Sequence, residues 1–457
     1  MATNENDKGG LIGGHPRGLY YLAFTETWER FSFYGMSALL TLYMVKQLLL
    51  PGHAEHVIGL AGLREVFEFR GPMSNVAFAS IIYGWYAGLV YFTPILGGWV
   101  ADRLLGAKRT VLIGVLLMSA GHLAMSFDQT FLFALGLLIL GSGFLKGNIS
   151  AQVGTLYRIE AESLRERGFT IFSTGICIGS ASGPLVTGLT AAIFGWHAGF
   201  AVAAALMLVA LFVYLAGQRY LPDVRPGARQ KTVAVALTVE ERRRVWALLA
   251  VIVLTIPAEI AYPMVWSMGI LWVDQQVHLA TSLGTVPSSW FGSADSIGAI
   301  LAAPVLLALW GWQARRGSEP TGVTKIGIGA ALVAVAALLF AAGNLGVTQP
   351  NSVGIGWALG GYLLMGLAWM YYWPTMLSLV SQAAPRAVTS TLMGVAFLSP
   401  FIGHTLMGWV GASYDKMHPS TFWAMDAAIA VCGAAIILLL RKPLMRGLEP
   451  RPEPVSK

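Results

Sequence analysis

The feature that most restricts the fold of this chain is a succession of long apolar segments. A membrane-spanning helix needs about 20 predominantly apolar residues, and 56% of the 457 residues are hydrophobic whereas only 12% are charged. Segments of the required length lie near residues 19–49, 77–100, 108–126, 130–156, 168–194, 198–217, 245–272, 288–312, 323–343, 354–383, 387–414 and 420–440. We therefore expect an all-α integral membrane protein with twelve transmembrane helices in a lipid bilayer.

Lysine and arginine are unevenly distributed between the loops. Most of them lie near the two termini and in alternate loops, and the remaining loops hold only Lys46, Arg64, Arg70 and Lys416. Positively charged loops of membrane proteins face the cytoplasm. The pattern predicts that both termini are cytoplasmic, and it explains the net charge of +7 without a nucleic-acid partner.

A charged, proline-containing segment separates the first six apolar segments from the last six. It predicts an N-terminal six-helix bundle at residues 1–217, a cytoplasmic linker at 218–244, a C-terminal six-helix bundle at 245–441 and a cytoplasmic tail at 442–457. Many transporters consist of two such halves, which move about a site near the middle of the membrane.

Few residues indicate covalent or metal chemistry. The two cysteines, Cys177 and Cys432, lie in apolar segments of different halves, and no spacing typical of metal ligands accompanies them. No set of nucleophile, base and oxyanion donor stands out. We therefore expect no enzymatic activity, no metal site and no cofactor.

The first apolar segment carries three charged residues in the stretch "FTETWERFSFYG". Glu26, Glu29 and Arg30 are spaced i, i+3 and i+4, so they share one face of a helix. Arg30 lies roughly 18 Å, and Lys146 roughly 16 Å, from the cytoplasmic end of its segment at 1.5 Å per residue. These two residues are the basic side chains expected inside the membrane.

Four charged groups at this depth must interact. An unpaired charge costs about 2.5–3.5 kcal/mol at the centre of a membrane helix, so the four are expected to pair around a water-filled cavity. One interpretation is a structural ion-pair lock between the first and fourth helices. We favour a substrate or proton site, because buried ion pairs rarely stabilise a protein more than apolar packing does.

Several motifs resemble one transporter family. "ETWERFSFYG" is similar to the ExxERFxYY signature of the proton-dependent oligopeptide transporters, a family of the major facilitator superfamily, with Phe33 in place of the first tyrosine. Further stretches that resemble this family are "LVYFTPILGGWVADRLLGAKR", "GSGFLKGNISAQVGTLY", "RERGFTIFSTGICIGSASGPL", "VPSSWFGSADSIGAILAAPVLLALW" and "LMGVAFLSPFIG".

The resemblance implies a major facilitator fold and symport of protons with di- and tripeptides. It implies that Glu26 and Glu29 pair with Arg30 and Lys146, and that these two cations also receive the carboxylate of the peptide. Protonation of Glu29 would free the cations for that carboxylate. Tyr34 and Tyr91 match family tyrosines that line the binding pocket, although either residue is also compatible with an ordinary core aromatic.

The second half departs from the family pattern. The glutamate of the tenth helix that receives the peptide's amino group aligns with Trp369, and Pro263 lies near the position of the family's gating glutamate in the seventh helix. Glu259, one turn earlier, is a candidate replacement for that glutamate. Three further family positions, an asparagine, an arginine and a tryptophan, align with Cys177, Ser37 and Ala396.

Two ionisable residues of the second half are compatible with a compensating role. Asp295 occupies the position of a family asparagine in the eighth helix and is a candidate receptor for an amine, the alternative being simple contact with water. His404 lies in the middle of the eleventh helix. For His404 we favour a neutral, hydrogen-bonded core histidine over a proton relay.

The sequence thus predicts a monomeric, proton-coupled importer of small peptides in a bacterial inner membrane. Alternatives are a proton-coupled transporter of a non-peptide organic anion, a facilitator without coupling and a transport-inactive sensor. The predicted proton-coupling residues are Glu26, Glu29, Arg30, Lys146 and Glu259. The predicted substrate-binding residues are Arg30, Tyr34, Tyr91, Lys146, Asp295 and Trp369.

Overall fold

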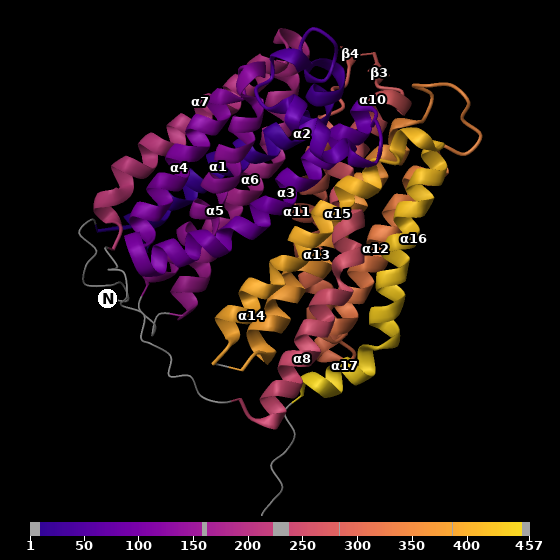
Figure 1. Ribbon diagram of the computed structural model, residues 1–457. Coiled ribbons are helices and arrows are strands. Elements are labelled where there is room, and N and C mark those ends of the chain that lie inside the picture. Colours follow the sequence, from indigo (N-terminus) through magenta and orange to yellow (C-terminus); the bar gives the residue numbers. More distant parts are fainter. Residues whose placement is uncertain (1–9, 158–161, 223–236, 283, 386, 450–457) are drawn as a thin grey trace, which may run out of the picture.

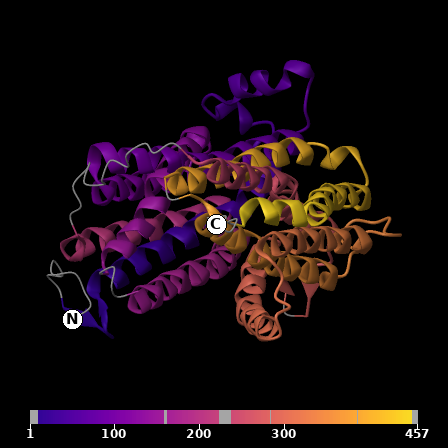
Figure 2. The same ribbon diagram turned by 90° about the horizontal axis from the view of Figure 1, so that it is seen from below.

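The computed structural model describes residues 10–157, 162–222, 237–282, 284–385 and 387–449. Two helical bundles lie side by side and diverge toward one end of the molecule (Figure 1). Figure 2 shows the bundles from that end. The N-terminal bundle contains α1 (Arg17–Tyr43), α3 (Asn75–Val100), α4 (Ala107–Ala124), α5 (Phe131–Thr155), α6 (Glu162–Phe194) and α7 (Trp196–Gly217).

The C-terminal bundle contains more helical pieces than predicted spans. Its elements are α8 (Val239–Leu254), α9 (Ile256–Ala261), α10 (Met268–Gln276), α11 (Trp290–Arg315), α12 (Gly322–Gly343), α13 (Ile355–Ala383), α14 (Thr389–Ala396), α15 (Leu398–Gly411) and α16 (Pro419–Leu439). The pieces α8 to α10 form the seventh predicted span, and α14 and α15 form the eleventh. Each of the twelve predicted spans coincides with a helix or with a run of helices.

Ten stretches of the described chain are long and apolar enough to cross a membrane. The helices α1 and α4 lie outside this set, because α1 carries the charged residues near its middle and α4 contains Lys108, Arg109 and His122. Both helices nevertheless pack within the N-terminal bundle, α1 against α6 and α7 and α4 against α5.

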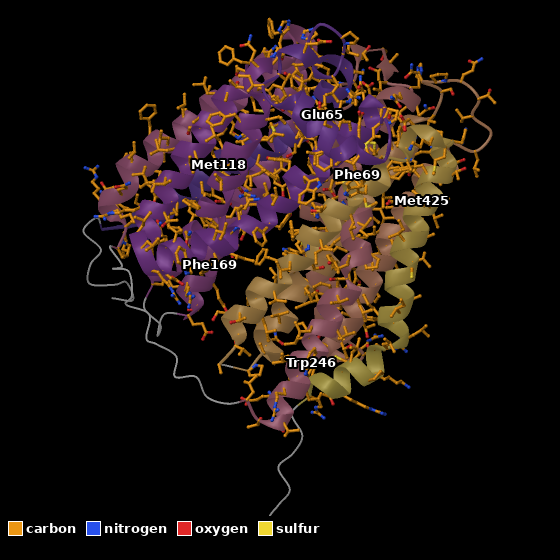
Figure 3. All side chains as sticks on the ribbon, viewed as in Figure 1. Glu65, Phe69, Met118, Phe169, Trp246 and Met425 are labelled. Carbon is orange, nitrogen blue, oxygen red and sulfur yellow. The ribbon has the colours of Figure 1, made fainter. Side chains whose placement is uncertain are left out.

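The remaining elements are short. A small antiparallel ribbon, β1 (Leu11–Ile12) with β2 (His15–Pro16), precedes α1, and another, β3 (Ala280–Thr281) with β4 (Gly284–Thr285), follows α10. The helix α2 (Leu60–Phe67) lies between α1 and α3, and α17 (Arg441–Leu448) follows α16. In Figure 3, Glu65 and Phe69 mark the end of the molecule at α2, and Phe169 and Trp246 mark the opposite end.

The boundaries of the predicted linker and tail differ in part from the structure. Helix α8 begins at Val239, inside the predicted linker, because Thr238 and Glu241 form a capping box at its start. Helix α17 occupies part of the predicted tail. Residues 223–236 of the linker and 450–457 of the tail lie outside the described residues.

The seventh and eleventh spans are both interrupted, and their breaks meet. Pro257 and Pro263 disturb the helical hydrogen bonds between α8 and α10, since proline has no N–H donor. Beside the first break, Thr255 Oγ1 lies 2.8 Å from Ser399 Oγ of α15. A Cβ atom on Gly403 would lie 2.3 Å from Glu259 Cβ, so glycine allows α15 to approach α9 closely.

Candidate substrate and proton site

The three charged residues of α1 form one buried cluster, as the spacing predicts. Arg30 Nε lies 2.9 Å from Glu26 Oε1 and also contacts Glu29 Oε2. The side chains are almost inaccessible, with 4% of Glu26, 0% of Glu29 and 7% of Arg30 exposed. One guanidinium group therefore faces two carboxylates away from bulk water.

Several polar atoms of this cluster remain without a hydrogen bond. Glu26 Oε2, Glu29 Oε1 and Arg30 Nη2 are buried and have no hydrogen-bond partner among the described residues. Buried polar atoms in native proteins usually have a partner. A free guanidinium nitrogen beside free carboxylate oxygens is suited to bind water, a proton or an anionic ligand.

Lys146 does not pair with the glutamates in this structure, so that prediction is wrong for the conformation observed. Its Nζ lies 4.3 Å from the centroid of Phe33 and 5.4 Å from that of Tyr91. No carboxylate lies within ion-pair distance of it in the part of the chain that the structure describes. The reason is that Arg30, on the same helix as both glutamates, already contacts both of them.

The two predicted pocket tyrosines lie between the bundles. Tyr34 of α1 is half-buried, and its ring lies 5.2 Å from that of Trp266, which belongs to the short helix Tyr262–Trp266 of the C-terminal bundle. The ring of Tyr91 on α3 lies 5.0 Å from that of His404 on α15 and 6.4 Å from that of Trp373 on α13. All three ring contacts cross from one bundle to the other, which is unlike a core aromatic of a single bundle.

Asp295 is buried on α11 and faces residues of the seventh span. Its Oδ2 accepts hydrogen bonds from the Tyr262 hydroxyl at 3.0 Å and from Trp266 Nε1 at 3.2 Å. Its Oδ1 is buried with no hydrogen-bond partner in the described chain. Because only 4% of Asp295 is exposed, simple contact with bulk water does not explain this residue.

Glu259 is buried at the break of the seventh span. Its Oε1 accepts a hydrogen bond of 2.6 Å from the hydroxyl of Tyr372 on α13, and its Oε2 lies 3.9 Å from His404 Nδ1. That nitrogen has no hydrogen-bond partner among the described residues, whereas the ring also has a hydrogen bond to the backbone of Pro400, as expected for a buried core histidine. Glu259, Tyr372 and His404 form a second polar group, within the C-terminal bundle.

Trp369, a predicted substrate-binding residue, has no polar or aromatic contact with the other predicted site residues. It is half-buried on α13 and makes no hydrogen bond and no aromatic ring contact within the described ranges. Trp373, one turn further along, contacts both Tyr91 and Phe397. Trp373 and Phe33 were not predicted as site residues. For both, the available signal was an aromatic ring one helical turn from a predicted site residue, Trp369 or Arg30.

The bundles are held together mainly toward the α2 end. There Lys46 Nζ lies 2.5 Å from Asp274 Oδ2, Thr41 Oγ1 lies 3.1 Å from Ser267 Oγ, and Trp290 Nε1 donates to the carbonyl oxygen of Leu185 at 2.9 Å. We call the pair Lys46–Asp274 the outer ion pair.

The other end carries an open pocket on the N-terminal bundle. Its volume is about 540 Å³, and it is lined by Glu162, Arg165, Glu166, Phe169, Thr170 and Ser173 of α6. Figure 3 shows Phe169 at this end of the bundle. The bundles are thus in contact at the α2 end, while α6 is accessible at the end that the charge pattern assigns to the cytoplasm.

This chain belongs to the major facilitator superfamily. Residues 29–408 match the family described as "Major Facilitator Superfamily". The fold and the twelve-span arrangement agree with it, and the protein is an integral, multi-pass membrane protein.

Relatives place the chain beside the oligopeptide transporters, as its motifs predict. It is 28% identical to the "Di-/tripeptide transporter" of Lactococcus lactis subsp. lactis (strain IL1403), over 95% of this chain and 96% of that protein. It is also 28% identical to the "Uncharacterized transporter YclF" of Bacillus subtilis (strain 168), with the same coverage. The predicted resemblance to this transporter family is confirmed.

Solved structures support the same fold. A peptide transporter POT in complex with sulfate has a TM-score of 0.83, with 24% identity over 97% of this chain and 98% of that chain. A POT family transporter in complex with 5-aminolevulinic acid has a TM-score of 0.82, with 22% identity over 96% of this chain and 98% of that chain.

Proposed function

We propose that this chain is a proton-coupled symporter that imports di- and tripeptides by alternating access. It acts as a monomer in a bacterial inner membrane, with both termini in the cytoplasm. The observation that carries the proposal is the contact of Arg30 with two buried carboxylates, while no carboxylate of the described residues lies within ion-pair distance of Lys146. The di- and tripeptide transporter among the relatives supports the substrate class.

The cluster on α1 supplies the coupling. With both glutamates ionised, Arg30 is already neutralised and a substrate carboxylate must compete for it. A proton on Glu29 removes one of the two acids that neutralise Arg30, so the guanidinium group can bind the carboxylate of the peptide together with Lys146. Proton binding and anion binding therefore favour each other, which is the requirement for symport.

The C-terminal bundle supplies the other end of the site. A peptide also carries an ammonium group, and burial of this charge without a partner costs several kcal/mol. Asp295 presents a buried oxygen that has no hydrogen-bond partner in the described ranges, and Glu259 lies at the break of the seventh span. We assign Asp295 to the ammonium group and Glu259 to the second proton-sensitive contact.

A non-peptide organic acid is the second candidate substrate. The observation in its favour is Trp369, which stands where the family has the amine-binding glutamate. A structurally similar POT family transporter is described in complex with 5-aminolevulinic acid, which contains no peptide bond. Arg30 and Lys146 keep the same role in this alternative.

Transport by the purified protein in proteoliposomes tests the proposal. With an acidic exterior, a labelled dipeptide should accumulate above its external concentration, and an uncoupler should abolish the accumulation. Competing ligands then test the substrate class. If N-acetylated peptides and simple organic acids inhibit the accumulation as well as free dipeptides do, the organic-acid assignment replaces the peptide assignment. Binding without any flux would identify a sensor instead.

A further inference from the structure

The resting position of Lys146 assigns a role to Phe33. The ammonium group lies 4.3 Å from the centroid of Phe33 and 5.4 Å from that of Tyr91, so it occupies a pocket made by two rings from different helices. We call Phe33 and Tyr91 the aromatic pair. A cation above a ring face is attracted by the ring quadrupole, and the attraction increases when water is excluded.

Phe33 also contacts the second cation of the site. Arg30 Cζ lies 5.6 Å from the centroid of the same ring, so one phenyl group lies against both cations. The ring is itself supported, because it stacks on Tyr86 with centroids 6.4 Å apart and packs against Tyr34 in a T-shaped arrangement with centroids 5.2 Å apart. These ring contacts fix the orientation of Phe33. The side chain is half-buried.

An aromatic neighbour has a different consequence for Lys146 than a carboxylate has. A carboxylate would neutralise the ammonium group and would have to be displaced by a substrate carboxylate. A ring holds the ammonium group in place but leaves its charge uncompensated. The contact with the ring is also weaker than a charge-assisted hydrogen bond, so an arriving anion gains more than it replaces.

We propose that Phe33 is a positioning residue that holds Lys146 away from Glu26 and Glu29 and keeps it available for the carboxylate of the substrate. The inference rests on the proposed function, because it assumes that Lys146 receives that carboxylate. Phe33 would thereby make the transporter select substrates with a free carboxylate over the corresponding amides.

Phe33→Leu tests this role, because leucine fills similar space without a ring. The KM for a dipeptide with a free carboxylate should rise about fivefold or more, as expected for the loss of a partly desolvated cation–π contact. The KM for the C-terminal amide of the same peptide should stay within about twofold. Phe33→Tyr keeps the ring face and should behave like the parent protein.

Phe24→Leu is the matched control. Phe24 lies on the same helix, is 43% exposed and has a ring contact with Trp28, whose centroid is 5.6 Å away. This substitution should leave both KM values unchanged. Equal losses for the free peptide and its amide in Phe33→Leu, or a Phe33→Tyr protein as impaired as Phe33→Leu, would overturn the positioning role.

The same experiment separates this inference from the proposed function. If the parent protein transports neither the peptide nor its amide, the proposed function fails before Phe33 is tested. If the parent transports the free peptide with a lower KM than the amide and Phe33→Leu preserves that difference, only the role of Phe33 fails.

Discussion

The buried acids of the two bundles have different partners. In the N-terminal bundle the acids and the arginine lie on one helix and contact one another directly. In the C-terminal bundle Asp295 and Glu259 are separate, and the hydroxyl or indole groups of Tyr262, Trp266 and Tyr372 donate hydrogen bonds to them. The first arrangement places acids and cations in competition, whereas the second presents isolated acceptors.

This difference indicates a division of roles across the site. A cluster in which acids and an arginine compete changes its affinity for an anion when one acid takes up a proton. An acid held by neutral donors keeps its place and has spare acceptor capacity for an ammonium group. We therefore propose that carboxylate binding and the main proton-coupling cluster belong to the N-terminal bundle. Ammonium binding, together with the second proton-sensitive contact at Glu259, is assigned to the C-terminal bundle.

The largest effect is expected from Glu29→Gln. Glutamine occupies nearly the same space but takes up no proton, so the N-terminal cluster loses its titratable competitor. Accumulation driven by a proton gradient should be abolished in proteoliposomes, while exchange of labelled for unlabelled peptide continues. A Glu29→Gln protein that still accumulates peptide against its gradient would exclude this residue from the coupling. Glu65→Gln, at the exposed surface of α2, is a matched control and should accumulate peptide normally.

The next effect is expected from Lys146→Ala. Removal of one of the two cations should weaken binding of a free dipeptide by about tenfold to a hundredfold, which is the range for a charge-assisted hydrogen bond. Binding of the C-terminal amide should weaken much less. Titration calorimetry with both ligands measures the difference. Equal losses for the two ligands would instead support a purely structural role for Lys146.

A smaller effect is expected from Asp295→Asn. The amide keeps an acceptor oxygen but loses the negative charge, so the affinity for a free dipeptide should fall about tenfold. N-acetylated dipeptides have no ammonium group and should bind as they bind the parent. Glu259→Gln, measured in parallel, shows which acid receives the ammonium group. If neither substitution distinguishes free from acetylated peptide, the ammonium role of the C-terminal bundle is wrong.

The smallest effect is expected from the outer ion pair. Lys46 and Asp274 join the bundles at 2.5 Å, but the lysine side chain is 44% exposed, and exposed ion pairs contribute little stability. Lys46→Ala should change peptide uptake by no more than about fivefold. A double-mutant cycle with Asp274→Asn measures the coupling between the two residues. A loss as large as that of Lys146→Ala would show that this pair controls transport.

Much of the fold was predictable from the apolar segments, because the membrane requires helices of nearly uniform length. The breaks inside the seventh and eleventh spans were not predicted. They depend on tertiary contacts, such as the close approach of α15 to α9 at Gly403, that no periodicity in one segment reveals.

The site was predictable to a different extent in each bundle. Glu26, Glu29 and Arg30 share a helix, so their spacing alone brought them together. The position of Lys146 depends on contacts among three helices, and Phe33 was not predicted as its neighbour. The link between Asp295 and Tyr262 joins residues 33 positions apart on different helices, which the sequence alone does not reveal.

One cycle of ligands and variants tests the division between the bundles most directly. Affinities for a dipeptide, its C-terminal amide and its N-acetyl form are measured for the parent, Lys146→Ala, Asp295→Asn and the double variant. The account predicts that the Lys146 loss disappears with the amide, that the Asp295 loss disappears with the acetyl form, and that the two losses add in the double variant. The division is contradicted if Lys146→Ala weakens binding of the amide as much as binding of the free dipeptide. It is contradicted likewise if Asp295→Asn weakens binding of the acetyl form as much as binding of the free dipeptide.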